Sequence, residues 1–291
     1  MPQPIALVTG ASSGIGYAIS IELAKRGFKV YAGARRMAQL QKLKDYKIIP
    51  IELDITSLES VQGARDIIAS DNDHLDVLFN NAGVIGDGPA MEVSDKDVQY
   101  CMEVNFNSQV RVTREFSPLV MKSKGVIAFT GSTAGRVILP FGSVYSASKA
   151  ALCAYANTLA FEVEPFGVKV VNFITGGVKT SMTVESSKPS LPSGSAYIVN
   201  GVDLLRSSRD NLDPSSLMEA ETYATKVVDD IEYALKGKSF LPGNYFVSFR
   251  GGASTTVKIL TDYFPRALCA FLFLNLFKLK EPFKEIQRKA N

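Results

Sequence analysis

The sequence predicts an α/β fold, in which one doubly wound parallel sheet carries helices on both faces and an apolar tail follows at the C-terminus. Short β-branched runs alternate with amphipathic stretches, as in repeated strand–helix units. The runs are almost entirely apolar, as expected for parallel strands covered on both faces. A glycine-rich turn follows the first run, which is typical of the Rossmann-type version of this fold. With 291 residues, the chain can form one such domain without disulfides.

The elements are expected in the following order. Strands are predicted over residues 5–8, 29–34, 48–52, 75–79, 125–130 and 169–174. Helices are predicted over residues 14–25, 57–70, 95–121, 143–164 and 219–235. Residues 175–218 include a long stretch rich in Ser, Pro and Gly, and we expect them to form a substrate loop or lid. The chain therefore divides into one α/β domain over residues 1–260 and a tail over residues 261–291.

Composition and charge argue against several classes of function. The net charge of +3 is too small to indicate nucleic-acid binding, and the chain has no basic block interleaved with aromatic residues. The three cysteines, Cys101, Cys153 and Cys269, lie far apart, which fits a reducing compartment and predicts no metal site. The N-terminus lacks a signal-peptide pattern, so we expect the catalytic domain on the cytosolic side of any membrane.

The stretch TGASSGIG, from Thr9 to Gly16, is compatible with two kinds of site. Its G-x-S-x-G pattern matches the nucleophile elbow of a lipid hydrolase, with Ser12 as the nucleophile. Its three glycines also match a turn that binds a dinucleotide pyrophosphate at a helix N-terminus. Position favours the second interpretation, because the turn follows the first strand and a second strand begins about twenty residues later. The only histidine available as a base, His74, lies in a polar stretch typical of a surface loop.

The residues after the second strand indicate which dinucleotide is bound. NAD enzymes usually place an acid there, which binds the ribose 2′-hydroxyl. This chain has Ala34, Arg35 and Arg36 instead, and the fork of a guanidinium group suits phosphate oxygens. The sequence therefore predicts NADPH rather than NADH, with Arg35 as the preferred contact of the 2′-phosphate.

Further polar motifs occur later in the chain: Asn80-Asn81-Ala82-Gly83, Asn105, Ser132, and Tyr145 with Lys149 in a Y-x-x-x-K pattern. With the glycine-rich turn, this highly specific combination resembles the short-chain dehydrogenase/reductase family over about residues 5–180. The resemblance implies that the catalytic residues are Asn105, Ser132, Tyr145 and Lys149. It implies cofactor contacts by Gly10, Ser12, Ser13, Gly14, Ile15, Gly16, Arg35, Arg36, Asp54, Ile55, Asn81, Ala82, Gly83, Tyr145, Lys149, Val178 and Thr180. Asp54 would lie near the adenine and Thr180 near the nicotinamide carboxamide, although each could instead cap a turn or helix.

The catalytic set also has a physical interpretation. Tyr145 and Lys149 are four residues apart on a predicted helix and so share one face. A phenol has a pKa of about 10, and a nearby ammonium is expected to lower the pKa of Tyr145 toward a useful range. Ser132 can hydrogen-bond a carbonyl oxygen on which negative charge develops. By resemblance, Asn105 would hold a water that links Lys149 to solvent.

One departure from the family is Thr175-Gly176-Gly177, where a proline usually precedes the glycine. With residues 129–132 and 140–145, this segment resembles one branch of the family, the fungal NADPH-dependent 1-acyldihydroxyacetone-phosphate reductases. That branch implies reduction of an apolar acyl ketone phosphate to 1-acylglycerol 3-phosphate (lysophosphatidic acid) in phosphatidic acid synthesis. Candidate contacts of the substrate phosphate, for each of which a solvated surface charge is the favoured interpretation, are Arg136, Lys179, Lys188, Arg206 and Arg209.

The tail has an apolar part over residues 267–277, and the cations that follow are Lys278, Lys280, Lys284, Arg288 and Lys289. The apolar part is too short for a membrane span, which needs about 20 residues. We therefore expect it to lie on a membrane or lipid-droplet surface, with the basic end at anionic head groups. The expected location is the endoplasmic reticulum membrane and lipid droplets. Alternatively, the tail is a helix packed on the sheet or on a second subunit.

Other functions remain open on the sequence alone. The same catalytic set could serve a retinol or 17β-hydroxysteroid dehydrogenase. Ser12 could be the nucleophile of a lipid hydrolase. A non-catalytic cofactor-binding scaffold is a further alternative, but it would have no use for the complete set of four catalytic residues. By resemblance, a homodimer would form through the helices expected at residues 95–121 and 143–164.

Overall fold

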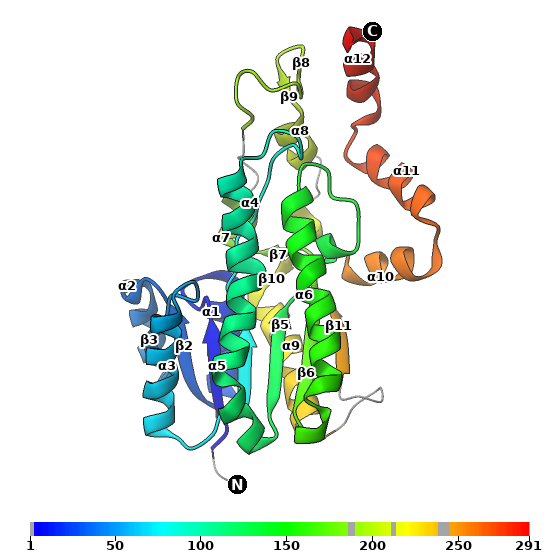
Figure 1. Cartoon of the computed structure of the whole chain (residues 1–291). Coiled ribbons are helices and arrows are strands. Elements are labelled where there is room, and N and C mark those ends of the chain that lie inside the picture. Colours follow the sequence, from blue (N-terminus) through cyan, green and yellow to red (C-terminus); the bar gives the residue numbers. More distant parts are fainter. Residues whose placement is uncertain (1–2, 186–189, 211–213, 238–244, 291) are drawn as a thin grey trace.

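The computed structural model describes residues 3–185, 190–210, 214–237 and 245–290 (Figure 1). A seven-stranded sheet forms its centre, in the order β11-β6-β5-β4-β1-β2-β3, and all its strands are parallel. The strands are β1 (Ile5–Thr9), β2 (Lys29–Ala34), β3 (Ile49–Glu52), β4 (Val77–Asn80), β5 (Val126–Thr130), β6 (Lys169–Thr175) and β11 (Tyr245–Arg250). The predicted doubly wound parallel sheet is confirmed.

Two layers of helices cover the sheet, as Figure 1 shows. The main ones are α1 (Gly14–Lys25), α3 (Leu58–Asp71), α5 (Ser108–Ser123), α6 (Ser143–Glu162) and α9 (Ala220–Leu235). On one face, α1 and α9 pack on alternate strand residues such as Val8. On the other face, α3, α5 and α6 pack on the intervening residues, such as Leu7. The strands are therefore apolar on both sides because both sides are core.

Two elements differ from the sequence prediction. The helix expected at residues 95–121 consists of α4 (Asp95–Met102), a π-helical turn (Glu103–Asn107) and α5. β11 was not predicted, because Ser248 and Arg250 interrupt its apolar residues and it lacks the wholly apolar character of the interior strands. It lies at the edge of the sheet and pairs with β6.

The segment expected to form a lid has structure of its own. It contains β7 (Val178–Lys179), α7 (Ser181–Glu185), the hairpin of β8 (Ile198–Val199) and β9 (Val202–Asp203), α8 (Leu204–Asp210), η5 (Pro214–Ser216) and β10 (Met218–Glu219). β10 pairs with β7, which returns this segment to the end of the sheet.

The tail forms three helices, α10 (Ser254–Tyr263), α11 (Arg266–Leu276) and α12 (Lys280–Ala290). Phe277 and Leu279, after α11, are buried against Val199, Leu204 and Leu205 of the lid segment. Phe277 and Leu279 thus pack on the lid segment, whereas α10 contacts β11 at the edge of the sheet. Among the described residues, no helix has the length and apolar character needed to cross a membrane.

An ion pair fastens β11 to α9. Asp230 on α9 is buried, and its carboxylate accepts hydrogen bonds from Ser248 Oγ (2.6 Å) and from Arg250 Nε and Nη2 (2.8 and 2.7 Å). Asp230→Ala leaves Arg250 unpaired, and we expect the free energy of unfolding to fall by about 2–3 kcal/mol.

Asp229→Ala is the matched control, because Asp229 is the preceding residue, is 55% exposed and pairs with Arg26. Its expected cost is below about 1 kcal/mol. Urea unfolding followed by circular dichroism measures both variants, and equal losses would contradict a special role for Asp230.

Candidate active site

A cavity of about 690 Å³ lies at the carboxyl ends of the parallel strands, where the loops after β1 to β6 converge. This edge is where open α/β sheets bind ligands. The predicted site residues that line the cavity are Gly10, Ser12, Ser13, Gly14, Ile15, Arg35, Arg36, Asp54, Ile55, Asn81, Ala82, Gly83, Ser132, Tyr145, Lys149, Val178 and Thr180. The other two, Gly16 and Asn105, do not line it. Nearly all of the predicted site residues therefore line one cavity.

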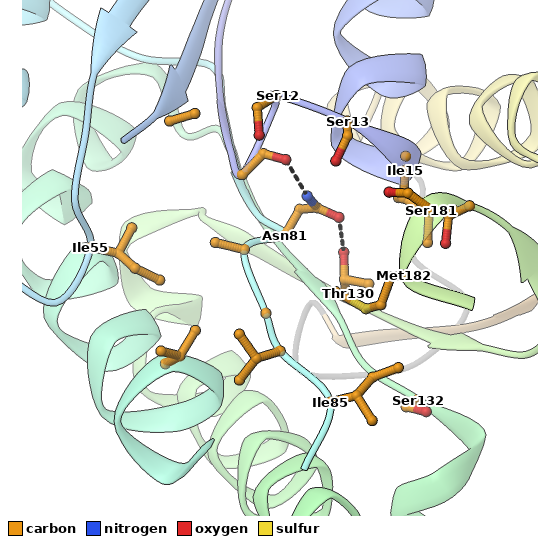
Figure 2. A pocket seen from close by; sticks show the side chains of 18 of the residues that line it. Ser12, Ser13, Ile15, Ile55, Asn81, Ile85, Thr130, Ser132, Ser181 and Met182 are labelled. Carbon is orange, nitrogen blue, oxygen red and sulfur yellow. Dashed lines mark hydrogen bonds between the residues drawn. The ribbon is translucent and has the colours of Figure 1, made fainter. Parts of the chain in front are cut away.

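The glycine-rich turn packs tightly against the loop after β4. Gly10 has a φ of +65°, and a Cβ there would lie 2.7 Å from the Cα of Ala82. A Cβ on Gly16 would lie 2.4 Å from Nδ2 of Asn81. The Asn81 amide donates to the Thr9 carbonyl (2.9 Å) and accepts from Thr130 Oγ1 (3.2 Å), so it links three strand ends. Figure 2 shows the hydrogen bond between Asn81 and Thr130. These close approaches explain why the turn needs glycine.

The turn leads directly into α1, whose N-terminus faces the cavity. Ser13 is the N-cap residue of α1, and its side chain makes no capping hydrogen bond. The first N–H groups of a helix lack partners within the helix, and they carry the positive end of its dipole. This arrangement fits the pyrophosphate of a dinucleotide.

The arginines after β2 fit an additional phosphate. Arg35 and Arg36 line the cavity and are exposed. Neither guanidinium group forms a hydrogen bond or ion pair with any residue in the described ranges. Two free guanidinium groups at this rim match the predicted 2′-phosphate contact, because Arg binds phosphate oxygens in pairs.

Two predicted cofactor contacts have local capping roles as well. Asp54 Oδ1 accepts hydrogen bonds from the N–H (2.9 Å) and hydroxyl (2.7 Å) of Thr56. Thr180 Oγ1 accepts from the N–H of Thr183 (3.2 Å) at the start of α7. Both side chains border the cavity, so the capping alternative is correct without excluding contact with a ligand.

The hydrolase alternative fails on geometry. Ser12 follows β1 and lies at the carboxyl end of the sheet, whereas His74 precedes β4 and lies at the opposite end. His74 Nε2 is 3.4 Å from a carboxylate oxygen of Asp76. Because the chain has a single histidine, Ser12 has no imidazole base within reach.

Tyr145 and Lys149 lie on α6 beside Ser132, which follows β5. The Lys149 ammonium donates to the Thr130 carbonyl (2.8 Å) and lies 5.9 Å from the centroid of the Tyr145 ring. Burial lowers the pKa of Lys149 to about 8. Ser132 hydrogen-bonds Tyr145, and its Oγ also accepts from the Ala134 N–H (3.1 Å) at the start of η3 (Thr133–Gly135).

The expected lowering of the Tyr145 pKa is wrong. Burial raises the pKa of Tyr145, and the hydrogen bond from Ser132 offsets only part of this effect. Negative charge on Cys101 or Asp87 would raise it further. The nearby Lys149 ammonium does not reverse this shift, because burial is its largest cause. Tyr145 therefore keeps its proton near neutral pH, which is the form that donates to a ketone oxygen.

Asn105 lies behind the cavity lining and holds two neighbouring segments together. It is fully buried in the π-helical turn. Its Oδ1 accepts from the Val84 N–H (2.8 Å), and its Nδ2 donates to the Val84 carbonyl (2.9 Å) and to Ser148 Oγ (3.0 Å). The side chain thus joins the loop after β4 to α6. A water held by Asn105 remains a prediction from the resemblance.

A buried ion pair that the sequence did not predict lies at the cavity wall. Asp87 lines the cavity, and its Oδ1 lies 2.8 Å from Nη2 of Arg209 on α8. Their side chains are only 9% and 7% exposed. Burial raises the pKa of Asp87, while Arg209 opposes this shift. The two residues are 122 positions apart, so no local motif could have revealed the pair.

The proposed phosphate contacts lie outside the cavity lining. Arg209 is bonded to Asp87, Arg136 to Asp262 and Lys179 to Glu219, while the backbone N–H of Arg206 donates to Asp203. Lys188 lies outside the described residues. In the described lining, the cations are Arg35, Arg36 and Lys149.

Thr175, which stands where the family usually has proline, also borders the cavity. Its Oγ1 lies 2.6 Å from the hydroxyl of buried Tyr223 and donates to the Phe173 carbonyl (3.1 Å). The hydroxyl therefore fixes the end of β6 to α9, which a proline could not do.

The chain is similar to known proteins of one family. A family model described as short chain dehydrogenase matches residues 4–190, and the chain belongs to this family of oxidoreductases. The NADPH-dependent 1-acyldihydroxyacetone phosphate reductase of Saccharomyces cerevisiae is 41% identical over 237 residues, which are 79% of each chain. The protein of the same name from Schizosaccharomyces pombe is 36% identical over 189 residues, 64% of this chain and 63% of its own.

A solved structure gives the same fold. A short chain dehydrogenase from Burkholderia cenocepacia, in complex with NADP, has a TM-score of 0.70 and 27% identity. The match covers 93% of this chain and 97% of that one. The predicted family and enzyme class are confirmed.

The pKa of Lys149 predicts a pH limit on ketone reduction. Its ammonium stabilises negative charge that develops on Tyr145, so kcat/KM should fall through a pKa of about 8, losing about tenfold per pH unit above it. A pH profile of kcat/KM measures this limit. Arginine stays charged, so in Lys149→Arg the fall of kcat/KM near pH 8 should disappear from whatever activity remains. An unchanged fall in that variant would assign it to another group.

Proposed function

We propose that this protein is an NADPH-dependent reductase that converts the ketone of 1-acyldihydroxyacetone phosphate to the alcohol of 1-acylglycerol 3-phosphate. The main support is that Ser132, Tyr145 and Lys149 meet in one cavity of a chain that is 41% identical to a reductase named for that substrate. The product would enter phosphatidic acid synthesis.

The residues of the cofactor end suit NADPH. The glycine turn and the α1 N-terminus would hold the pyrophosphate, and Arg35 and Arg36 would hold the 2′-phosphate. Bound NADPH supplies the hydride that reduces the ketone carbon. The chain itself positions the dinucleotide and provides the proton.

The residues at the catalytic end of the cavity, Ser132, Tyr145 and Lys149, would deliver the proton. Ser132 hydrogen-bonds the ketone oxygen and thereby stabilises the negative charge that develops there. Tyr145 then donates its phenolic proton to this oxygen, and its raised pKa keeps that proton available. Lys149, charged below a pH of about 8, stabilises the phenolate that remains.

The substrate end of the site supports an apolar ketone and leaves a second candidate. Ile85, Val104 and Met182 line the cavity and could contact an acyl chain. Asp87 contributes a carboxylate there, and Arg209 is already bonded to it. The described part of this wall therefore offers no free cation to a substrate phosphate, which makes a neutral apolar ketone, such as a steroid or retinal, the second candidate substrate.

A substrate panel tests the proposed reaction. Purified protein with NADPH should reduce 1-acyldihydroxyacetone phosphate faster than a steroid ketone or retinal, as measured by NADPH oxidation. Tyr145→Phe should lower turnover by at least about a hundredfold, because general acid catalysis is lost. NADPH binding should remain, because the phenol is not needed for it. Turnover only with the neutral ketones would support the second candidate, and normal turnover by Tyr145→Phe would refute the mechanism.

Cofactor preference depends on the arginines of the rim. In Arg35→Ala, KM for NADPH should rise by about tenfold or more, because a charge-assisted contact with phosphate is lost. KM for NADH should stay the same, since NADH lacks the 2′-phosphate. Steady-state kinetics with both dinucleotides measure this, with Arg206→Ala as the control on an arginine outside the cavity. Parallel rises with NADH and NADPH would contradict the assignment.

We further propose that the tail attaches the protein to the endoplasmic reticulum membrane and lipid droplets, with the catalytic domain in the cytosol. α11 exposes Leu268, Phe271, Leu272 and Leu276, and cationic residues follow it. A helix with this character can lie on a lipid surface without crossing it.

The triple variant Phe271→Ser, Leu272→Ser, Leu276→Ser should lose binding to anionic phospholipid vesicles in a flotation assay. The substitutions change only exposed side chains, so the fold should survive. Phe161→Ser, which changes an exposed aromatic residue on α6, is the control. Unchanged flotation of the triple variant would refute attachment through α11.

A further inference from the structure

A second cavity, of about 450 Å³, lies between η3, the start of α6 and the tail helices α10 and α11. Its volume is within the range of small-molecule sites, about 300–1,000 Å³. Most of its walls are apolar, including Val137, Ile138, Phe264, Cys269 and Phe273. The cavity is therefore suited to an apolar chain.

The second cavity is separate from the catalytic one. η3 packs directly on α6, and a Cβ on Gly135 would lie only 2.9 Å from the backbone N of Ala150 and the carbonyl carbon of Lys149. The consecutive residues Tyr145 and Ser146 line different cavities. A molecule in the second cavity would therefore not be the reacting ketone.

The polar groups of the second cavity define one positive charge and one unused hydroxyl. Arg136 is neutralised by Asp262 (2.5 Å) and lies over the Phe249 ring. Arg266 is exposed, and its guanidinium group forms no hydrogen bond or ion pair with a residue in the described ranges. Ser146 Oγ is buried and has no hydrogen-bond partner among the described residues. A buried hydroxyl without a partner is uncommon in proteins and indicates a missing one.

We propose that this cavity binds a single-chain anionic amphiphile, either a free fatty acid or a lysophospholipid with a phosphate group. The chain would lie among the apolar side chains, the anionic head group would pair with Arg266, and a ligand oxygen would bond Ser146. One uncompensated cation matches one anionic head group. The inference concerns residues outside the catalytic set and does not depend on which ketone is reduced.

Isothermal titration calorimetry on the full-length protein, saturated with NADPH, tests the proposal. Oleate and 1-oleoylglycerol 3-phosphate are the two anionic probes, and oleyl alcohol is the neutral one, all below their micellar concentrations. At least one anionic probe should bind at one site per chain that Ala147→Leu weakens, and more tightly there than the alcohol. 1-Oleoylglycerol 3-phosphate, the product of the proposed reaction, can also occupy the catalytic cavity, so only the site that responds to Ala147→Leu is counted. The probe that binds this site more tightly identifies the source. Absence of stoichiometric binding by both would overturn the proposal.

Variants distinguish binding in the second cavity from adsorption to the exposed face of α11. Arg266→Gln should weaken the anionic probe by about tenfold and leave oleyl alcohol unchanged. Ala147→Leu, which fills part of the cavity, should weaken every probe. Phe271→Ser, on the exposed face, should change nothing. The opposite pattern, with loss only in Phe271→Ser, would show adsorption to α11 and overturn the proposal. Tyr145→Phe should retain binding, so failure of the reductase proposal would not affect this result.

Discussion

The hydrogen bonds that join the carboxyl ends of β1, β4 and β5 are the constraint on which the site depends. The Thr9 hydroxyl accepts from the N–H groups of Asn81 and Ala82, and the Asn81 amide connects Thr9 to Thr130. The Thr130 carbonyl in turn holds the ammonium of Lys149. A buried polar network is stable only if its members are satisfied, so the cofactor turn and the catalytic lysine are held by the same set of bonds.

Burial shifts the protonation equilibria of Tyr145 and Lys149. It disfavours charge on both groups, raising the pKa of the Tyr145 phenol and lowering that of the Lys149 ammonium. At neutral pH the phenol holds its proton and the ammonium keeps most of its charge. Reduction of a ketone uses both groups in these states, whereas oxidation of an alcohol must begin from a phenolate. The apolar surroundings of α6 thus favour the protonated phenol with which the proposed ketone reduction begins.

Local motifs were sufficient to predict the sheet apart from β11, the glycine turn, and most of the residues that meet in one cavity, because each depends on residues close together in sequence or on strand ends that a parallel sheet brings together. Features made by distant contacts were not predictable. Asp87 and Arg209 are separated by 122 positions, and the packing of Phe277 on Leu204 likewise requires the folded tail. The direction of the Tyr145 pKa shift was also missed, because spacing reveals that Lys149 is near but not how far both groups are buried.

The shared apolar cluster of the tail and the lid segment has a practical consequence for protein engineering. Leu279 and the start of α12 pack on the β8–β9 hairpin, so a fusion partner or affinity tag attached after α12 would load an element that shares packing with this hairpin. β1 begins at the opposite end of the molecule, at the amino edge of the sheet (Figure 1). Tags and reporter domains placed there leave the lid undisturbed.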